Sequence, residues 1–409
     1  MTSNQSAGAL EGIRVIDLSR ILAGPWATQV LADLGAEVVK IESPDAGDGT
    51  RAWGPPFVNG EGSDAAYFTS CNRNKRSVCI DFSKPAGAKL ITELVKGADV
   101  FVQNFKVGGL DKYGLDAKTL QAINPKLIYC SISGFGSTGP YASRPGYDFL
   151  IQAMGGLMSI TGAPDGMPGA EPMKTGVAIC DLFTGLYASN AIQAALIHRS
   201  HSGQGQHIDC SLLDTQIAML ANQASNWLVG NQIPTRLGNE HPNIVPYKAY
   251  EVADGHLIIA VGNDAQFQRL CEVLSLTELA KDARFTTNPS RVAHRLELDD
   301  VLIPALKLWH RNTLLHALED ANVPAGPIRQ IDEVFDDPHT DARSLKIKQT
   351  RSDGVEINTV GFPVQLSQTP ATYRSAPPIL GESTEEVLMN ELNLSLDSIR
   401  HLRRDGAIQ

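Results

Sequence analysis

The sequence predicts an α/β fold, in which a parallel sheet carries helices on both of its faces. Two observations lead to this fold class. Short β-branched, apolar runs alternate with amphipathic helical patterns through roughly the first 140 residues, and this alternation is typical of parallel sheets. The chain has 409 residues, of which 43% are hydrophobic and 20% are charged, so it has apolar material for two or three domains of about 150 residues.

The first three elements are expected to be a strand, a helix and a second strand. Ile13–Leu18 is a strand-like run that leads through a Gly-Pro loop into a helix across Trp26–Leu34. Pro25 just inside the helix start and Gly35 just past its end follow the usual asymmetry of helix termini. Glu37–Glu42 is the next strand.

The same alternation continues to about residue 215. A turn at Ser202–Gly205 leads into a strand at Gln206–Ser211, and a helix follows from Asp214. Between Glu42 and Ser202, further strands are expected at Ser77–Phe82, Val100–Gln103 and Leu127–Ser133, with helices near 85–97 and 117–123.

The pattern changes after about residue 225. A loop at 239–246 precedes a hairpin of 249–252 and 256–261, and the Asp254-Gly255 dipeptide between them favours a tight turn. About 60 mostly helical residues follow, and Val323–Arg329 is a turn-rich return. A short strand pair is expected within 344–361, and Thr384–Leu392 is expected to be the final helix.

Composition and charge exclude several classes of protein. With 35 basic and 45 acidic residues the formal net charge is −10, which argues against a nucleic-acid binder. No run of about 20 apolar residues indicates a membrane span, and Met1–Gly8 lacks the features of a secretory signal. The six cysteines contain no Cys-x-x-Cys pair, so we expect reduced thiols in a cytoplasmic protein.

Asp181 interrupts a long apolar passage, Gly176–Ile197, that begins extended and ends helical. A buried carboxylate without a partner is costly, so it is normally hydrogen-bonded, shifted in pKa, or both. One interpretation makes Asp181 the N-cap of a helix. The other makes it a nucleophile or base in a dry cleft. The two are compatible, because a helix N-terminus also stabilises negative charge.

Several common catalytic motifs are absent. The turn after the first strand lacks Gly-x-Gly-x-x-Gly, although Glu42 follows some 20 residues on, so dinucleotide binding is not favoured. The sequence has no P-loop motif and no Gly-x-Ser-x-Gly motif. Its ten histidines are scattered without metal-ligand spacing, and we expect no metal site.

Two basic segments are candidates for phosphate contacts. Asn72–Ser77 precedes a strand and is either a solvated turn or a phosphate-binding run. Asn104–Gly114 follows a strand end, which is where ligands bind open α/β sheets. In this second segment Lys106 and Lys112 are placed to meet phosphates, and Phe105 and Tyr113 to flank a ring.

Taken together, these segments resemble the class III CoA-transferases of the formyl-CoA transferase and carnitine CoA-transferase type. The resemblance covers nearly the whole chain, and in it Asp181 matches the family's nucleophilic aspartate. The segments that carry it are Arg20–Pro25, Leu34–Glu42, Gly47–Arg51, Asn72–Ser77, Asn104-Phe105, Gly134–Gly136, Gly146–Asp148, Gly176–Gly185, Gly203–Gly205 and Pro378–Gly381.

The resemblance implies an interlocked homodimer. Each chain would have a large Rossmann-like domain, residues 1–215 and 325–409, and a smaller α+β domain, residues 225–322. It also implies an enzyme that moves CoA from an acyl-CoA to a carboxylic acid through aspartyl-anhydride and aspartyl–CoA thioester intermediates. No permanently bound cofactor is expected. The loop Gly238–Tyr247 is a candidate for the lid that keeps water from these intermediates.

The resemblance also assigns CoA-binding positions. Ile21 and Phe105 would wall the adenine, and the phosphates would meet Asn104, Lys106, Lys112 and Arg144. Two basic positions of formyl-CoA transferase correspond to Ser43 and Ser83 here, so Arg73 or Arg76 is expected to replace them. The remaining positions assigned to CoA are Tyr113, Tyr147 and Asp148.

Within the family, a racemase branch pairs its aspartate with a histidine in a Gly-His-Asp segment. This chain has Gly146-Tyr147-Asp148 instead, and tyrosine does not replace that histidine near neutral pH. Transfer is therefore favoured over 2-methylacyl-CoA racemisation. A further alternative is a protein that binds CoA without catalysis. The complete motif around Asp181 argues against this alternative.

Arg51–Phe57, Arg144–Asp148 and His241–Tyr247 resemble the corresponding segments of succinyl-CoA:glutarate and related dicarboxylate CoA-transferases. We therefore expect succinyl-CoA as donor and a C4–C6 dicarboxylate such as glutarate, or a sulfinate analogue, as acceptor. The second carboxylate needs an anchor, and Arg20 or Arg51 is a candidate because guanidinium binds carboxylate bidentately. For Arg20, a structural or CoA contact is an equal alternative. His241 is a further candidate for substrate contact.

Overall fold

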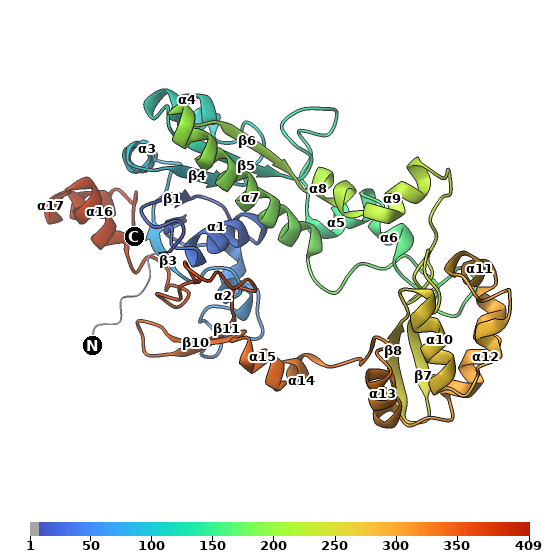
Figure 1. Cartoon of the computed structure of the whole chain (residues 1–409). Coiled ribbons are helices and arrows are strands. Elements are labelled where there is room, and N and C mark those ends of the chain that lie inside the picture. The colour runs from blue at the N-terminus through green and yellow to red at the C-terminus, as the bar shows by residue number, and fades with distance from the viewer. Residues whose placement is uncertain (1–7) are drawn as a thin grey trace. The chain divides into compact units, whose positions relative to one another are not determined.

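The computed structural model describes residues 8–409, and the segment on which the absence of a secretory signal was predicted lies outside them. The chain divides into two compact units (Figure 1). The larger contains the described residues up to Leu157, together with Lys174–Gly230 and His339–Gln409. The smaller contains Met158–Met173 and Asn231–Pro338. Residues 158–173 and 325–338, expected in the large domain, thus group with the smaller unit.

The larger unit is built on a six-stranded sheet in the order β3-β2-β1-β4-β5-β6. Every neighbouring pair is parallel, as the strand and helix alternation predicts. The carboxyl ends of the strands therefore share one edge, and the order reverses between β1 and β4, where open α/β sheets bind ligands. The strands are β1 (Arg14–Asp17), β2 (Glu37–Glu42), β3 (Lys75–Cys79), β4 (Val100–Gln103), β5 (Ile128–Ser133) and β6 (His207–Ser211).

Helices cover both faces of this sheet (Figure 1). Alternate strand residues point to opposite faces, so Val15 and Val38 pack with α1 and α7, while Ile16 and Val39 pack on the other face. The helices of the first face are α1 (Ala23–Asp33) and α7 (Ile179–Ser202), and those of the second are α3 (Pro85–Lys96), α4 (Ala117–Ile123), α16 (Thr384–Leu392) and α17 (Leu396–Arg404).

Shorter elements complete the larger unit. A two-stranded antiparallel pair, β10 and β11, lies where a short strand pair was predicted. The remaining elements are η1 (Gly49–Ala52), α2 (Ala66–Thr69), η2 (Asp111–Tyr113), α5 (Asp148–Met154), α6 (Leu157–Ile160, at the boundary of the units), α8 (Leu212–Met219), α9 (Ala221–Leu228), α15 (Pro338–Ala342), β10 (Lys346–Thr350) and β11 (Glu356–Val360).

Two predictions about helices were wrong. Asp181 is the third residue of α7 and not its N-cap, because the helix already begins at Ile179. Thr384–Leu392 is not the final helix, since α17 follows it. Asn393 adopts a left-handed conformation that ends α16, and the hydroxyl of Ser395 accepts the Ser398 N–H to start α17.

The smaller unit is an antiparallel three-stranded sheet, β7-β8-β9, with helices around one apolar core. The predicted hairpin is β7 and β8, and the turn-rich return contains β9. Its elements are β7 (Tyr247–Val252), β8 (Gly255–Ala260), α10 (Asp264–Val273), η3 (Leu279–Lys281), α11 (Asn288–Ala293), α12 (Arg295–Leu306), α13 (Arg311–Asp320), β9 (Ala325–Pro327) and α14 (Ile331–Phe335).

Three further findings concern residues 8–409. None of their helices combines the length and apolarity needed to cross a bilayer. No group of three or more His, Cys, Asp or Glu side chains is arranged to hold a metal ion within this range. All six cysteines are free thiols.

Candidate active site

A cleft of about 920 Å³ opens at the carboxyl ends of β1 and β4, where the strand order reverses. Asp181 lines this cleft. Seven residues predicted to contact CoA or substrate line it as well, although they come from three separate stretches of sequence: Arg20, Ile21, Asn104, Phe105, Lys106, Arg144 and Tyr147. The structure therefore brings the predicted nucleophile and most of the predicted CoA positions to one place.

A second cleft of about 650 Å³ lies beside the carboxyl ends of β2 and β3, and Arg20 and Phe105 line both clefts. Ser43 and Phe82 belong to the second cleft. The Phe82 ring meets Phe105 and Tyr113 edge to face, with centroids 5.3 and 5.2 Å apart. The two clefts share Arg20 and Phe105, and the aromatic rings of Phe105 and Phe82 at the edge of the sheet suit a ligand with a flat ring.

The carboxylate of Asp181 is half-buried in the first turn of α7. It has no ion-pair or hydrogen-bond partner among the residues that the structure describes. Burial raises the pKa of Asp181 to about 7, and the negative charge of Asp148 adds to the effect. A carboxylate without a partner in a ligand-sized cleft can act as a nucleophile or as a base.

Asp148 fixes the start of α7. Its Oδ1 accepts the backbone N–H of Cys180 at 2.8 Å and of Asp181 at 3.4 Å. Its Oδ2 accepts from Gln152 Nε2 at 2.7 Å, and Gln152 Oε1 in turn accepts the Thr175 N–H at 2.9 Å. The residue at the N-cap position, Ala178, has no side-chain acceptor, so Asp148 supplies the cap from α5. These bonds give Asp148 a positioning role, and its predicted contact with CoA stays a prediction.

Three exposed cations line the first cleft: Arg20, Lys106 and Arg144. None of them forms an ion pair within residues 8–409. The guanidinium of Arg20 lies 4.5 Å from the centre of the Phe105 ring, and that of Arg144 lies 4.8 Å from the centre of the Tyr141 ring. Such cations are available to phosphate or carboxylate groups of a ligand. Lys112 is likewise exposed, with its Nζ 4.7 Å from the centre of the Tyr113 ring.

Arg73 and Arg76 were predicted as phosphate contacts, but the structure pairs both with carboxylates of the protein. The guanidinium of Arg73 is buried and donates twice to Asp33, at 2.9 and 2.5 Å, and once to the Val360 carbonyl. Arg76 pairs with Glu391 at 2.7 Å. Both arginines lie at the amino end of β3, opposite the clefts, because this strand begins at Lys75.

Arg51 is not a free anchor for a substrate carboxylate either. It is buried beneath the second cleft, and its guanidinium donates to Glu42 at 2.8 and 2.7 Å and to Asp64 at 2.8 Å. A further bond goes to the Pro378 carbonyl, and the Phe68 ring stacks on the guanidinium at 3.6 Å. Because these partners occupy Nε and both terminal nitrogens, Arg51 stabilises the fold and Arg20 is the remaining candidate anchor.

His241 lies in the smaller unit, within the loop that was considered as a lid. Its ring packs against Tyr247, with centroids 5.2 Å apart, and its Nδ1 accepts the Asn243 N–H at 3.0 Å. Burial and the nearby Arg295 lower the pKa of His241. The imidazole is therefore neutral near pH 7, with its Nε2–H available as a donor.

Sequence reasoning missed Tyr67 on α2. Its ring meets Trp53 edge to face, with centroids 5.2 Å apart. Burial raises the pKa of Tyr67 to about 12, and the charge of Asp181 is the next contribution, so the phenol is within electrostatic reach of Asp181 and stays protonated. No motif marks this position in the sequence; only the fold brings it near Asp181.

A cleft that contains a half-buried carboxylate and three exposed cations suits a group-transfer enzyme that acts on anionic substrates. The sequence profile of CoA-transferase family III matches residues 10–384, so the chain belongs to that family and is a CoA-transferase.

Relatives that are named as CoA-transferases are similar over most of their length. A succinate–glutarate CoA-transferase of Agrobacterium fabrum is 54% identical, over 93% of this chain and 94% of that protein. The human succinyl-CoA:glutarate CoA-transferase is 41% identical, over 98% of this chain and 90% of that protein. A crystal structure of a CaiB/BaiF family protein from Brucella suis matches with a TM-score of 0.83 and 51% identity, covering 95% of this chain and 100% of that one.

Proposed function

We propose that this enzyme transfers CoA from succinyl-CoA to glutarate or another C4–C6 dicarboxylate, with sulfinate analogues as further acceptors. One observation carries the proposal: Asp181 and three exposed cations share a cleft, and within residues 8–409 neither the carboxylate nor the cations form an ion pair. The glutarate activity of the similar enzymes from Agrobacterium and human supports this choice of acids.

In the proposed first half-reaction, a carboxylate oxygen of Asp181 attacks the thioester carbonyl of succinyl-CoA. The carbon–sulfur bond breaks, CoA leaves as a thiolate, and a succinyl–aspartyl anhydride remains. The thiolate then attacks the aspartyl carbonyl and expels succinate, which leaves an aspartyl–CoA thioester. Covalent catalysis of this kind conserves the energy of the thioester.

In the second half-reaction, a carboxylate oxygen of glutarate attacks the aspartyl thioester and expels the thiolate again. The thiolate attacks the glutaryl carbonyl of the new anhydride, which releases glutaryl-CoA and restores the Asp181 carboxylate. No net proton is taken up or released in the cycle. The nucleophile must be ionised at the start, and its pKa of about 7 leaves a large fraction ionised at neutral pH.

The positions of the cations support a separate role for each of them in binding the CoA phosphates or the dicarboxylate. Lys106 and Arg144 line the cleft that contains Asp181, and Lys112 follows on the same loop as Lys106, so we assign them to CoA phosphates. Arg20 lines both clefts and is exposed. We assign it to the second carboxylate of the dicarboxylate, with a CoA contact as the competing assignment.

We also propose that the chain forms an interlocked homodimer that works in the cytoplasm. Large apolar side chains are exposed on α5, α7, α8 and the end of α9, and 76% of Leu228 and 84% of Val229, the residue after α9, is exposed. Apolar surface of this extent normally meets a partner, and a second copy of the chain fits the symmetry of most soluble oligomers. The other exposed apolar side chains of this surface are Phe149, Leu150, Phe183, Leu186, Tyr187, Ile217 and Trp227.

The proposal is tested by offering purified enzyme succinyl-CoA with a panel of mono- and dicarboxylic acids and sulfinates, with mass spectrometry of the CoA products. We expect glutaryl-CoA among the main products. Hydroxylamine should trap an aspartyl adduct at Asp181 in the presence of succinyl-CoA alone. Asp181→Ala should bind CoA and transfer none; transfer by this variant, or labelling of another residue, would refute the mechanism.

A further inference from the structure

The loop Ser19–Ile21, which joins β1 to α1, has an unusual backbone. Ile21 has a φ of 71°, in the left-handed region that L-residues with branched Cβ atoms rarely adopt. Arg20 and Ile21 both line the cleft that contains Asp181. A strained residue at this position needs a surrounding structure that holds it.

Every backbone polar group of the three residues is bound by a side chain. These side chains come from β1, β2, the loop before η1, the loop after β4 and the loop after α2. The contacts are Ser19 N–H to Asp17 (2.9 Å), Lys40 to the Ser19 carbonyl (2.9 Å), Arg20 N–H to Asn104 (2.8 Å), Asn104 to the Arg20 carbonyl (2.6 Å), Ile21 N–H to both oxygens of Asp48 (3.1 and 3.2 Å) and Cys71 to the Ile21 carbonyl (3.8 Å).

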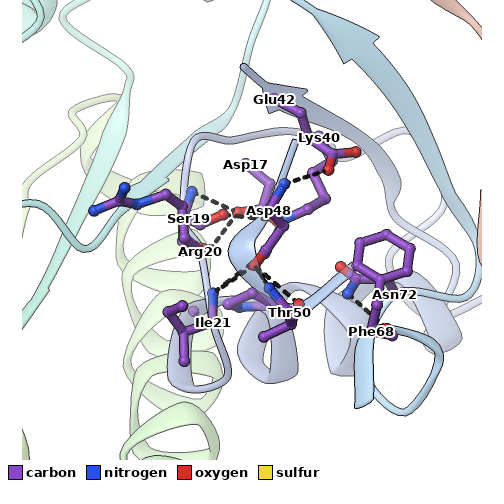
Figure 2. Close-up of polar contacts among 12 residues, drawn as sticks. Asp17, Ser19, Arg20, Ile21, Lys40, Glu42, Asp48, Thr50, Phe68 and Asn72 are labelled. Carbon is purple, nitrogen blue, oxygen red and sulfur yellow. Dashed lines mark hydrogen bonds and ion pairs between the residues drawn. The ribbon is translucent and has the colours of Figure 1, made fainter. Parts of the chain in front are cut away.

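Asp48 is the member of this set that holds the strained residue (Figure 2). Its carboxylate is buried and also accepts Thr50 N–H at 3.0 Å and Thr50 Oγ1–H at 2.9 Å. Lys40, which is fully buried, donates to Asp48 at 2.9 Å and to the Ser19 carbonyl at 2.9 Å. The buried Lys40–Asp48 pair thus holds both ends of the loop, since Lys40 binds the Ser19 carbonyl and Asp48 binds the Ile21 N–H. Removal of either partner would leave a buried charge unpaired.

We propose that Asp48, paired with Lys40, is a positioning residue for the CoA thioester: it fixes the left-handed Ile21 and so presents Arg20 and Ile21 to the substrate. The proposal rests on the proposed function, since it takes an acyl-CoA as the ligand of the cleft. Asp48 acts through the loop, so its loss should weaken substrate binding while Asp181 keeps its reactivity.

The first test is Asp48→Asn. An amide keeps one acceptor for the Ile21 N–H but turns a donor toward Lys40, so the ion pair is lost. We expect the KM for succinyl-CoA and the Kd for CoA, the latter by calorimetry, to rise about tenfold, as loss of one charge-assisted hydrogen bond predicts. The kcat should change by less than about threefold, because the groups around Asp181 are untouched.

Asp33→Asn is the matched control. Asp33 is equally buried and accepts from Arg73 and Asn74 at the opposite edge of the sheet. We expect it to lower thermal stability as Asp48→Asn does, but to leave KM and Kd unchanged. Should Asp48→Asn fail to fold, Thr50→Val removes one hydrogen bond to the same carboxylate, and about a threefold rise in Kd is expected.

Ile21→Gly separates positioning from general stability. Glycine adopts positive φ without strain, so the loop no longer depends on Asp48 to hold its conformation. In the Ile21→Gly background, Asp48→Asn should therefore raise Kd by less than half the factor it causes in the natural sequence. Additive effects of the two substitutions, or an unchanged Kd in Asp48→Asn alone, would overturn the inference.

The same measurements keep the two proposals apart. Wild-type enzyme that binds CoA but transfers none to any acid refutes the proposed reaction, and the Kd values still decide the role of Asp48. Wild-type enzyme that does not bind CoA refutes both.

Discussion

At the scale of single residues, the proposed mechanism links the pKa of Asp181 to the pH dependence of the reaction. Because that mechanism needs the ionised carboxylate to attack the thioester, we expect kcat/KM for succinyl-CoA to rise with pH and level off above about 7. Asp148→Asn removes the neighbouring charge and should move this limb to lower pH. A profile without an acid limb between pH 5 and 9, measured by initial rates, would contradict the assignment.

The same pKa predicts an effect on stability. The folded state holds the Asp181 proton up to about pH 7, whereas the unfolded chain releases it near pH 4. The folded form therefore binds more protons between these values, and its stability falls as pH rises through this window. Asp181→Asn removes the penalty, so its melting temperature should exceed that of wild type by more at pH 8 than at pH 4. An equal difference at both pH values would show that burial of the charge is not costly here.

Tyr67 is expected to donate a hydrogen bond to the oxyanion formed at the thioester carbonyl. Its phenol remains protonated, since burial and Asp181 raise its pKa to about 12. Tyr67→Phe should lower kcat by about ten- to a hundredfold with little change in stability, as loss of one oxyanion donor does. Tyr250→Phe, in the buried core of the smaller unit, is the control and should leave kcat unchanged.

Single residues also show where sequence reasoning ends. The motif around Asp181 predicts the nucleophile, and the strand ends predict Asn104, Phe105 and Lys106. Arg51 and Arg73 match the sequence pattern equally well, yet both are buried in ion pairs. Asp33, the partner of Arg73, lies 40 positions away in the chain, and local sequence does not reveal which cation finds an internal partner.

At the scale of elements, the contact between α1 and α7 sets where Asp181 lies. Gly185, one turn after Asp181, packs so closely on α1 that a Cβ added there would lie 2.6 Å from the Ala23 carbonyl oxygen and 3.0 Å from the Trp26 side chain. A substitution at Gly185 must therefore push the two helices apart.

We expect Gly185→Ala to destabilise the fold by about 1–3 kcal/mol through overpacking, and to lower kcat because the first turn of α7 moves. Chemical denaturation and initial rates check the two effects. Gly326→Ala is the control, since a Cβ at Gly326 meets nothing within 4 Å. Normal stability of Gly185→Ala would show that α7 adapts without cost.

Elements were easier to predict than their ends. The six strands expected up to residue 211 overlap β1 to β6. They could be predicted because the burial of one or both faces of an element imposes a hydrophobic periodicity on its sequence. Helix starts depend on caps that come from distant residues: Asp148 caps α7 from α5, so the sequence near Asp181 could not show that the helix begins at Ile179. The small helix α17 was missed because a left-handed Asn393 separates it from α16 by only a short turn.

At the scale of the whole molecule, we propose that the exposed apolar surface of α5 to α9 is the dimer contact. Replacing Leu228 and Val229 together by Asp should weaken assembly, because two charges would enter an apolar interface. Native mass spectrometry should show a dimer for wild type and an increased monomer fraction for the variant. A monomeric wild type would contradict the proposal.

The α/β sheet draws on distant parts of the chain. Val387 and Ile399 pack on the same apolar core as Ile16, and the Asp81 N–H donates to the Ala407 carbonyl beside β3. On the ribosome, the strands emerge long before residues 384–408 that cover their face. That face of the sheet therefore stays uncovered while the smaller unit is synthesised, and we expect a fragment that ends before residue 384 to expose it and to aggregate.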